Sequence, residues 1–173
     1  MSLTYIIDGY NVMHRCRGLL STADHSIETA RNELVDRVVR YCAESMDHAV
    51  IVFDGRGPLS ESARPEHFAN VEIVYSPKHL NADTLIERRI YEATGRTNYV
   101  VVSGDKGIRD LCRGMGSLAL TPDNFLTTLR NAFEQDRQVR QYAADQSKRN
   151  EVSDRLDAGS LQKLIELRKK LDR

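Results

Sequence analysis

Four aspartates stand at positions where their carboxylates could gather around a cation. Asp8 and Asp54 each directly follow a short apolar run, and Asp105 lies shortly after a third run. Asp83 belongs to the first turn of an expected helix. If these side chains converge, they repel one another strongly unless protons or a cation neutralise them. We therefore expect a hard divalent cation such as Mg²⁺, with Asp8, Asp83 and Asp105 as direct or water-mediated ligands and Asp54 as an acceptor beside them.

An acidic magnesium site of this kind favours the hydrolysis of a phosphodiester. One or two ions can polarise a phosphoryl oxygen, help to deprotonate a water and stabilise the leaving oxygen. Zinc is disfavoured because the sequence contains no matching cluster of histidine or cysteine. For any single aspartate, a turn or a helix cap is an equally good explanation. The prediction rests on all four together, and each is a candidate catalytic residue.

The apolar runs predict the strands that would position these acids. Short β-branched runs alternate with segments of helical period, which is typical of an α/β domain with a mostly parallel sheet. Parallel sheets bind ligands at the carboxyl ends of their strands, where the acids would meet. We expect about five strands: Leu3–Ile7, Ala49–Phe53, Val71–Tyr75, Tyr99–Val102 and Ser117–Leu120.

Helical spacing of apolar residues predicts the remaining elements. Ser26 and Asn81 are the expected N-caps of two helices, a third spans Lys106–Gly114 with Gly114 as its left-handed C-cap, and Pro122 begins a long fourth. The segment from Gly55 to Asn70 reads as a long loop. We expect one domain at residues 1–140 and a helical extension at 141–173, whose leucine stripe packs back on it.

Composition excludes several classes of protein. Lys plus Arg and Asp plus Glu number 25 each in 173 residues, so no global field attracts a polyanion. Cys16, Cys42 and Cys112 form no CxxC pair, which favours reduced, small buried residues. The beginning MSLTYIIDGY lacks the pattern of a secretion signal, and no apolar stretch is long enough for a membrane. We expect a cytoplasmic protein without a membrane partner.

Four motifs together resemble a known family. They are Ile6–Val12 with its Asp-Gly-Tyr-Asn core, Val52–Gly55, Asn81–Glu87 and Val101–Gly107. In this order they resemble the YacP-like branch of the NYN nucleases, which is related to the PIN domains. The resemblance implies a three-layer Rossmann-like fold and a Mg²⁺- or Mn²⁺-dependent endoribonuclease with acidic positions at Asp8, Asp54, Asp83 and Asp105. It also suggests single-stranded, structured or ribosome-associated RNA as the partner.

Polar and basic residues near the expected active edge could hold the substrate. Asn11 could bind a metal-bound water or a phosphate, and Ser103 could orient Asp105; local hydrogen bonding in turns explains both equally well. Tyr10 and Phe68 could stack on an unpaired base, although packing is the more common role of such residues. Basic side chains follow each strand, and most such residues are ordinary solvated charges. The substrate-binding candidates are Asn11, Ser103, Lys106, Arg15, Arg56 and Lys78.

Two other functions compete with the nuclease. A phosphatase-like hydrolase of similar fold could use the aspartate after the first strand, but Asp8 is followed by Gly9, Tyr10 and Asn11 without the second acid of that pattern. A non-catalytic RNA- or ribosome-binding module could keep the same fold. Clustered carboxylates disfavour this second alternative because they repel a polyanion.

Overall fold

The computed structural model describes residues 2–16, 26–55, 65–77, 79–93, 96–154 and 163. The chain divides into two compact units, residues 1–131 and 132–173. The first unit contains the sheet and all buried hydrophobic residues of the described chain, the last of which is Leu129. The expected division at residue 140 stays a prediction.

The first unit is built on a six-stranded sheet in the order β3-β4-β2-β1-β5-β6. Five strands are parallel, and β3 alone runs antiparallel, along β4. Asp8 pairs with Val52 and Phe53 pairs with Tyr75, so neighbouring strands end at nearly the same level. The strands are β1 (Thr4–Asp8), β2 (His48–Phe53), β3 (Glu66–Phe68), β4 (Val71–Tyr75), β5 (Tyr99–Val102) and β6 (Leu118–Leu120).

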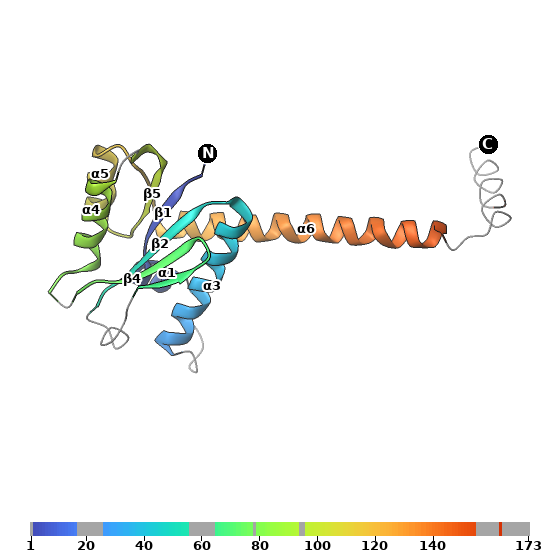
Figure 1. Ribbon diagram of the computed structural model, residues 1–173, viewed down its shortest axis with the longest axis horizontal. Coiled ribbons are helices and arrows are strands. Elements are labelled where there is room, and N and C mark those ends of the chain that lie inside the picture. Colours follow the sequence, from blue (N-terminus) through green and yellow to red (C-terminus); the bar gives the residue numbers. More distant parts are fainter. Residues whose placement is uncertain are drawn as a thin grey trace. The chain divides into compact units, whose positions relative to one another are not determined.

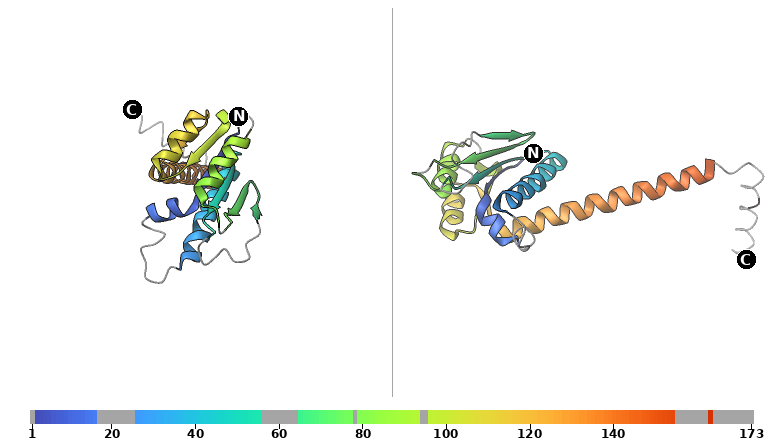
Figure 2. Two further views of the ribbon diagram at one scale, coloured as in Figure 1. Left: turned by 90° about the vertical axis from the view of Figure 1, so that its left-hand side faces the viewer. Right: turned by 90° about the horizontal axis from the view of Figure 1, so that it is seen from below.

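Helices cover both faces of this sheet, as Figures 1 and 2 show. On one face, α4 and α5 pack on Ile6, Val50 and Val101 in a continuous apolar core. On the other, Tyr5 contacts Tyr41 of α3 and Phe125 at the start of α6. The helices are α1 (Gly9–Arg15), α3 (Ile27–Ser45), α4 (Ala82–Glu92), α5 (Lys106–Gly114) and α6 (Pro122–Asp154), with a short 3₁₀ helix at Arg96–Asn98.

The predicted α/β fold with a mostly parallel central sheet is confirmed. The buried run in β2 lies between two other strands, as its apolar character at successive positions predicts. The predicted caps are also found: Ser26 accepts a hydrogen bond from the Thr29 amide at 3.1 Å, and Asn81 from the Thr84 amide at 2.9 Å.

Three local predictions were wrong or incomplete. The segment read as a loop contains β3, whose three half-buried or exposed residues show no apolar alternation. Gly114 is not a left-handed cap: it is the last residue of α5, the C-cap is Met115, and the positive φ of 96° belongs to Gly116. Helix α1 was not predicted, because it begins at Gly9 directly after β1 and is only seven residues long.

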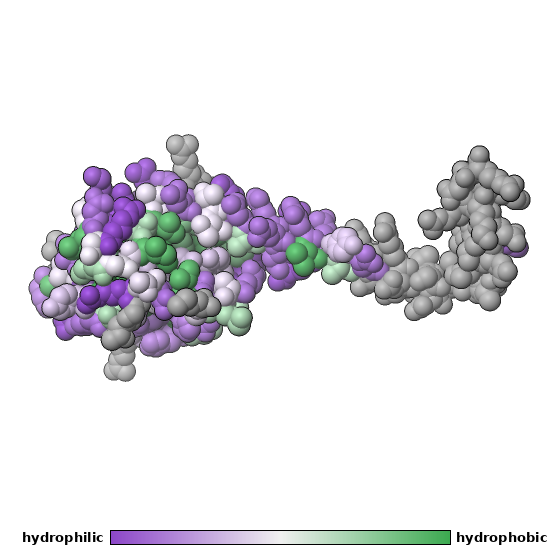
Figure 3. All heavy atoms as spheres, turned by 90° about the horizontal axis from the view of Figure 1, so that it is seen from above, coloured by the Kyte–Doolittle hydropathy of each residue, from purple (hydrophilic) through white to green (hydrophobic). Residues whose placement is uncertain are grey.

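The described surface is mainly hydrophilic. In the face shown in Figure 3, purple atoms predominate and apolar atoms form a small group on the first unit. Exposed apolar side chains include Tyr91, Leu111 and Leu118. Cys42 and Cys112 are buried and Cys16 is half-buried, all three as free thiols. Within the described residues, no helix is sufficiently long and apolar to span a bilayer.

Candidate acidic site at the carboxyl ends of the strands

Asp8 is a buried carboxylate at the junction of β1 and α1. It is the last residue of β1 and the N-cap of α1, and its residue surface is only 5% exposed. One carboxylate oxygen accepts a hydrogen bond from the Asn11 amide N–H at 3.0 Å, and the other accepts from the Asn11 side-chain amide. Burial nevertheless raises the pKa of Asp8, and the nearby Asp54 raises it further. Asn11 therefore holds a carboxylate whose charge the surroundings disfavour.

The turn between β5 and α5 places Asp105 beside the start of α1. Asp105 caps α5 by accepting the Gly107 amide N–H at 2.6 Å, and its own amide donates to Ser103 Oγ at 3.1 Å. Ser103 is fully buried, so it orients the backbone of Asp105. A Cβ at Gly104 would lie 2.4 Å from Asn11 Oδ1. Glycine at this position lets the turn that carries Asp105 touch α1, the helix that Asp8 caps.

A clamp between β2 and β4 fixes the position of Asp54. The Gly55 amide donates to Ser76 Oγ at 3.0 Å, and the Ser76 amide donates to the Phe53 carbonyl at 2.9 Å. The Ser76 hydroxyl also donates to the Leu80 carbonyl at 3.0 Å, just before α4. Both Ser76 and Gly55 are buried, and a Cβ on Gly55 would lie 1.7 Å from the Ser76 carbonyl oxygen. Ser76 was not predicted as a site residue, since an isolated serine after a strand gives no signal.

The pKa of Asp83 depends on the other acidic side chains of the site. It lies in the first turn of α4 and is partly buried. Its pKa is raised by burial and then by the charges of Asp8, Asp105, Glu87 and Asp54, in decreasing order of effect. Carboxylates from the ends of β1 and β2 and the starts of α4 and α5 therefore act on one another electrostatically.

Glu87 is a fifth acid that the sequence analysis did not select. It lies four residues after Asp83 on α4, a spacing that puts both side chains on one face of the helix. Its charge contributes to the raised pKa of Asp83. The four-residue spacing from Asp83 could have identified Glu87 in the sequence. Acidic pairs with this spacing are common on solvated helix faces, so the spacing alone does not indicate a site.

The donor chemistry of this edge suits a hard cation held partly through water. All the groups are carboxylate or amide oxygens, which Mg²⁺ and Mn²⁺ prefer. Within the described part of the chain, no three acidic, histidine or cysteine side chains gather closely enough to form a ready-made metal cage. Mg²⁺ commonly uses only one or two carboxylates and takes its other ligands from water and phosphate. The residues therefore fit an ion whose remaining ligands come from water and from the phosphate of a substrate.

The predicted substrate-binding residues occupy different environments. Lys106 begins α5 with its side chain 83% exposed and its ammonium 3.5 Å from Asp110. Arg15 is exposed at the end of α1. Arg109, one of the basic residues that follow the strands, donates to the Ser103 carbonyl at 2.6 Å and is thereby tied to the turn that carries Asp105. Arg56 and Lys78 lie outside the described residues.

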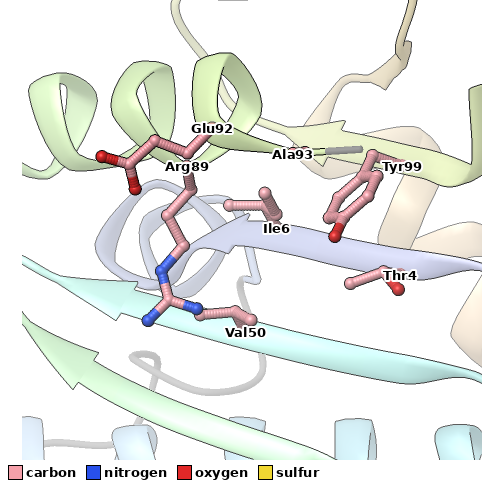
Figure 4. A pocket seen from close by; sticks show the side chains of 7 residues that line it. All are labelled: Thr4, Ile6, Val50, Arg89, Glu92, Ala93 and Tyr99. Carbon is pink, nitrogen blue, oxygen red and sulfur yellow. The ribbon is translucent and has the colours of Figure 1, made fainter. Parts of the chain in front are cut away.

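A cavity beneath α4 is separate from the acidic edge. Its volume is about 360 Å³, and Figure 4 shows Thr4 and Tyr99 lining it together with Arg89. Thr4 and Tyr99 are the first residues of β1 and β5, so the cavity lies toward the amino ends of the strands. Arg89 forms a two-pronged ion pair with Glu72 at 2.8 and 3.0 Å, which joins α4 to β4. This cavity holds none of the four aspartates.

The fold and the site together define an α/β protein with an acidic site at the carboxyl edge of a parallel sheet. The family model of the YacP-like NYN domain matches residues 5–169, and the chain belongs to this family. Membership supports a nuclease-type function related to RNA. A comparison with curated proteins found no match.

Two solved structures share the fold. The crystal structure of Rae1 (YacP) from Bacillus subtilis is 19% identical, with a TM-score of 0.65 over 99% of this chain and 93% of that chain. Its W164L mutant is 22% identical, with a TM-score of 0.65 over 81% and 82% of the two chains. At this level of identity the likeness establishes the three-layer architecture.

Proposed function

We propose that this protein is a Mg²⁺- or Mn²⁺-dependent endoribonuclease that hydrolyses phosphodiester bonds of RNA at the acidic edge. The observation that carries the proposal is the placement of Asp8 at the end of β1 and of Asp83 and Asp105 at the starts of α4 and α5. Their mutual repulsion adds to the effect of burial, which raises the pKa of Asp83. Repulsion of this kind lowers stability and is expected where a cation is to be bound. Membership in the YacP-like NYN family supports the same activity.

In this proposal Asp8, Asp83 and Asp105 hold the ion, directly or through water, and Asp54 accepts a hydrogen bond beside them. A bound ion would supply charge neutralisation at the phosphoryl oxygen and a lower pKa for a nearby water. Asp8 is kept in place by the two hydrogen bonds from Asn11. Ser103 keeps the backbone of Asp105 in place.

Positive side chains would bring the phosphate backbone to a site that is itself negative. Lys106 and Arg15 are exposed: Lys106 begins α5 directly after Asp105, and Arg15 ends α1, the helix that Asp8 caps. Arg56 and Lys78 remain predicted members of the same group. Such contacts position RNA without reading its sequence. We include single-stranded, structured and ribosome-associated RNA in the substrate class, and a cytoplasmic location in the proposal.

The decisive experiment is cleavage of defined RNAs and matched DNAs by the purified chain. With Mg²⁺ or Mn²⁺ we expect internal cleavage of RNA, and no cleavage in EDTA. Asp8→Asn and Asp83→Asn should each reduce the rate on the order of 100-fold or more, because each removes charge that binds the cation. Glu92→Gln is the matched control, because Glu92 is an exposed carboxylate at the other end of the helix that carries Asp83.

Undiminished cleavage by both aspartate variants, in preparations free of contaminating nuclease, would contradict the proposed site. Persistent activity at full chelation would contradict the metal requirement. Release of phosphate from small phosphoesters, with RNA left intact, would instead favour the phosphatase-like alternative.

A further inference from the structure

Tyr10 is a partly exposed aromatic residue at the acidic edge. It is the second residue of α1 and follows Asp8 by two positions, so it lies where β1 ends. Burial and then the charge of Asp54 raise the pKa of Tyr10, while the charge of Arg31 lowers it. The phenol therefore stays protonated at neutral pH and lies within electrostatic range of Asp54. The ring and the carboxylates belong to the same edge of the sheet.

The ring of Tyr10 is held against that of Phe53, the residue before Asp54. The two ring centres are 5.3 Å apart in a T-shaped contact with an interplanar angle of 79°. Phe53 is fully buried and stacks on Tyr75 at a centroid distance of 5.8 Å. A Cβ at Gly9 would lie 2.4 Å from the Phe53 ring, so the start of α1 lies directly on it. The position of Tyr10 is thus fixed relative to the end of β2.

A buried arginine supports the rings from α3. Arg31 is only 9% exposed, and its guanidinium lies 5.8 Å from the ring centre of Phe53 and 5.4 Å from that of Tyr75. It also donates to Glu66 at 2.7 Å, which ties α3 to the hairpin of β3 and β4. The aromatic residues on which Tyr10 rests are therefore held from two further elements.

The T-shaped contact leaves at least one face of the Tyr10 ring uncovered by Phe53, because in such a pair one ring presents its edge to the face of the other. Tyr10 is partly exposed, so solvent reaches part of its ring. Its hydroxyl makes no hydrogen bond with another described residue, so packing holds the ring in place. A fixed ring with an accessible surface suits stacking.

We propose that Tyr10 stacks on a base of the RNA beside the phosphodiester that is cleaved at the acidic edge, without selecting which base. The inference rests on the proposed ribonuclease function, because the base would belong to a nucleotide next to the cleaved bond. Phe68, the other residue that the sequence suggested for stacking, pairs with Val71 at the amino end of β4 and lies away from this edge.

The charges around Tyr10 favour a base over a phosphate as its partner. The carboxylates of Asp8 and Asp54 repel a phosphate unless a cation lies between them, whereas a neutral base brings no such repulsion. Stacking on an aromatic side chain contributes about 1–3 kcal/mol per base, and every base has a face that can stack. Tyr10 would therefore add affinity at a place where positive side chains are not needed.

The test is equilibrium binding of labelled 12-nucleotide chains to the full protein in EDTA, followed by fluorescence anisotropy. An all-uridine RNA is compared with an abasic chain that has the same sugars and phosphates. Tyr10→Leu keeps an apolar contact with Phe53 but removes the aromatic face. It should bind the uridine RNA about fivefold more weakly than the wild type, at the lower end of the stacking contribution, and bind the abasic chain equally well.

Two further variants control for the hydroxyl and for the loss of any tyrosine. Tyr10→Phe keeps the ring and should bind both chains as the wild type does. Tyr91→Ala removes a tyrosine that is 72% exposed near the opposite end of the helix that carries Asp83, and it should also change neither affinity. Thermal unfolding monitored by circular dichroism identifies variants that fail to fold, and Tyr10→Met replaces Tyr10→Leu if leucine is not tolerated.

Several outcomes would overturn the proposal. A wild type that binds both chains equally well would show that no base is held. An equal loss on both chains in Tyr10→Leu would assign Tyr10 to the fold or to the sugar–phosphate backbone. A loss in Tyr10→Phe as large as that in Tyr10→Leu would assign the effect to the hydroxyl.

The failure of this inference is distinguishable from that of the nuclease. Because EDTA prevents metal-dependent cleavage, the binding experiment does not depend on activity. Cleavage of RNA without a base-dependent effect of Tyr10→Leu would remove only the stacking site. A base-dependent effect without cleavage would leave a protein that binds RNA and would remove the nuclease.

Discussion

Asp83 combines a favourable and an unfavourable position. As an acid in the first turn of α4 it interacts well with the helix dipole, but burial and then the charges of Asp8, Asp105, Glu87 and Asp54 oppose its ionisation. In the free protein the second effect prevails, because the pKa of Asp83 is raised. A residue that lowers the stability of the metal-free protein, at a place where several carboxylates meet, is expected to serve binding.

Asp83→Asn should therefore stabilise the metal-free protein at neutral pH. Relief of repulsion, discounted for solvent screening, amounts to roughly 0.5 kcal/mol, or about 2 °C in the unfolding temperature. The measurement is thermal unfolding in EDTA at low ionic strength. Added Mg²⁺ should raise the unfolding temperature of the wild type and have a smaller effect on the variant.

The stability gained by Asp83→Asn should depend on pH. A raised pKa means that the folded state keeps the Asp83 proton at a pH where the unfolded chain has lost it. The stability that this proton contributes is complete below the unfolded pKa and is lost as the pH rises through the folded pKa. The advantage of Asp83→Asn should grow as the pH rises from about 4 to 7. An advantage that stays constant over this range would exclude ionisation as its cause.

At the scale of elements, the site depends on how closely adjacent loops approach. Gly55 meets the backbone of Ser76, and Gly104 meets the side chain of Asn11. The first contact sets the end of β2 against the end of β4, and the second sets the loop after β5 against α1. Each of these glycines lies next to an aspartate in the sequence. Small residues thus determine the separation of the carboxylates.

Gly55→Ala should destabilise the domain and reduce cleavage. Its Cβ would fall 1.7 Å from a backbone oxygen, which no side-chain rotation relieves. We expect a loss of about 3 kcal/mol, at the upper end of overpacking. Gly114→Ala is the control: nothing lies within 4 Å of its Cβ, and the residue is in α5, where alanine should add about 0.5–1 kcal/mol. The measurement is urea unfolding of both variants beside the wild type.

The outcome separates a local requirement at Gly55 from a general intolerance of alanine. Equal stability of the two variants would show that the β2 and β4 ends can separate without loss. If Gly55→Ala kept its stability but lost cleavage, the substitution would have acted by displacing the neighbouring Asp54.

At the scale of the whole molecule, the core is complete before the middle of α6. Phe125 and Leu129 are the last buried hydrophobic residues of the described chain, and both belong to the first unit. The predicted leucine stripe at residues 161–171 lies almost entirely outside the described residues. Its packing on the domain therefore stays a prediction from the sequence.

Removal of residues 141–173 tests that prediction. Residues 1–140 should still fold cooperatively, because they contain every described buried residue. If the leucine stripe packs on the domain, the free energy of unfolding should fall by roughly 2 kcal/mol, the value of burying about one leucine. The measurement is urea unfolding of the shortened and full chains. Unchanged stability would mean that the extension is independent and free to contact a partner.

The sequence by itself determined the layers, the N-caps of α3 and α4 and the strand ends that carry Asp8 and Asp54. The runs of β-branched residues in β2 and β5 predicted buried parallel strands, and Asn81 was predicted as a cap because its hydrogen bond is local. Asp8 and Asp54 were identified for the same reason, since each follows its strand directly. Local rules missed β3, because its stability comes from pairing with β4 and not from its own three residues.

Only the tertiary structure decided which side chains share an environment. The effect of Glu87 on Asp83, the clamp of Ser76 on Gly55 and the burial of Arg31 under the β3–β4 hairpin depend on the distances between elements. Such contacts join residues far apart in the chain, for example Arg31 and Glu66. The type of either residue does not predict which residue it will contact. The four aspartates were visible in the sequence, but their mutual repulsion follows from the register of the parallel strands, which ends them at nearly the same level.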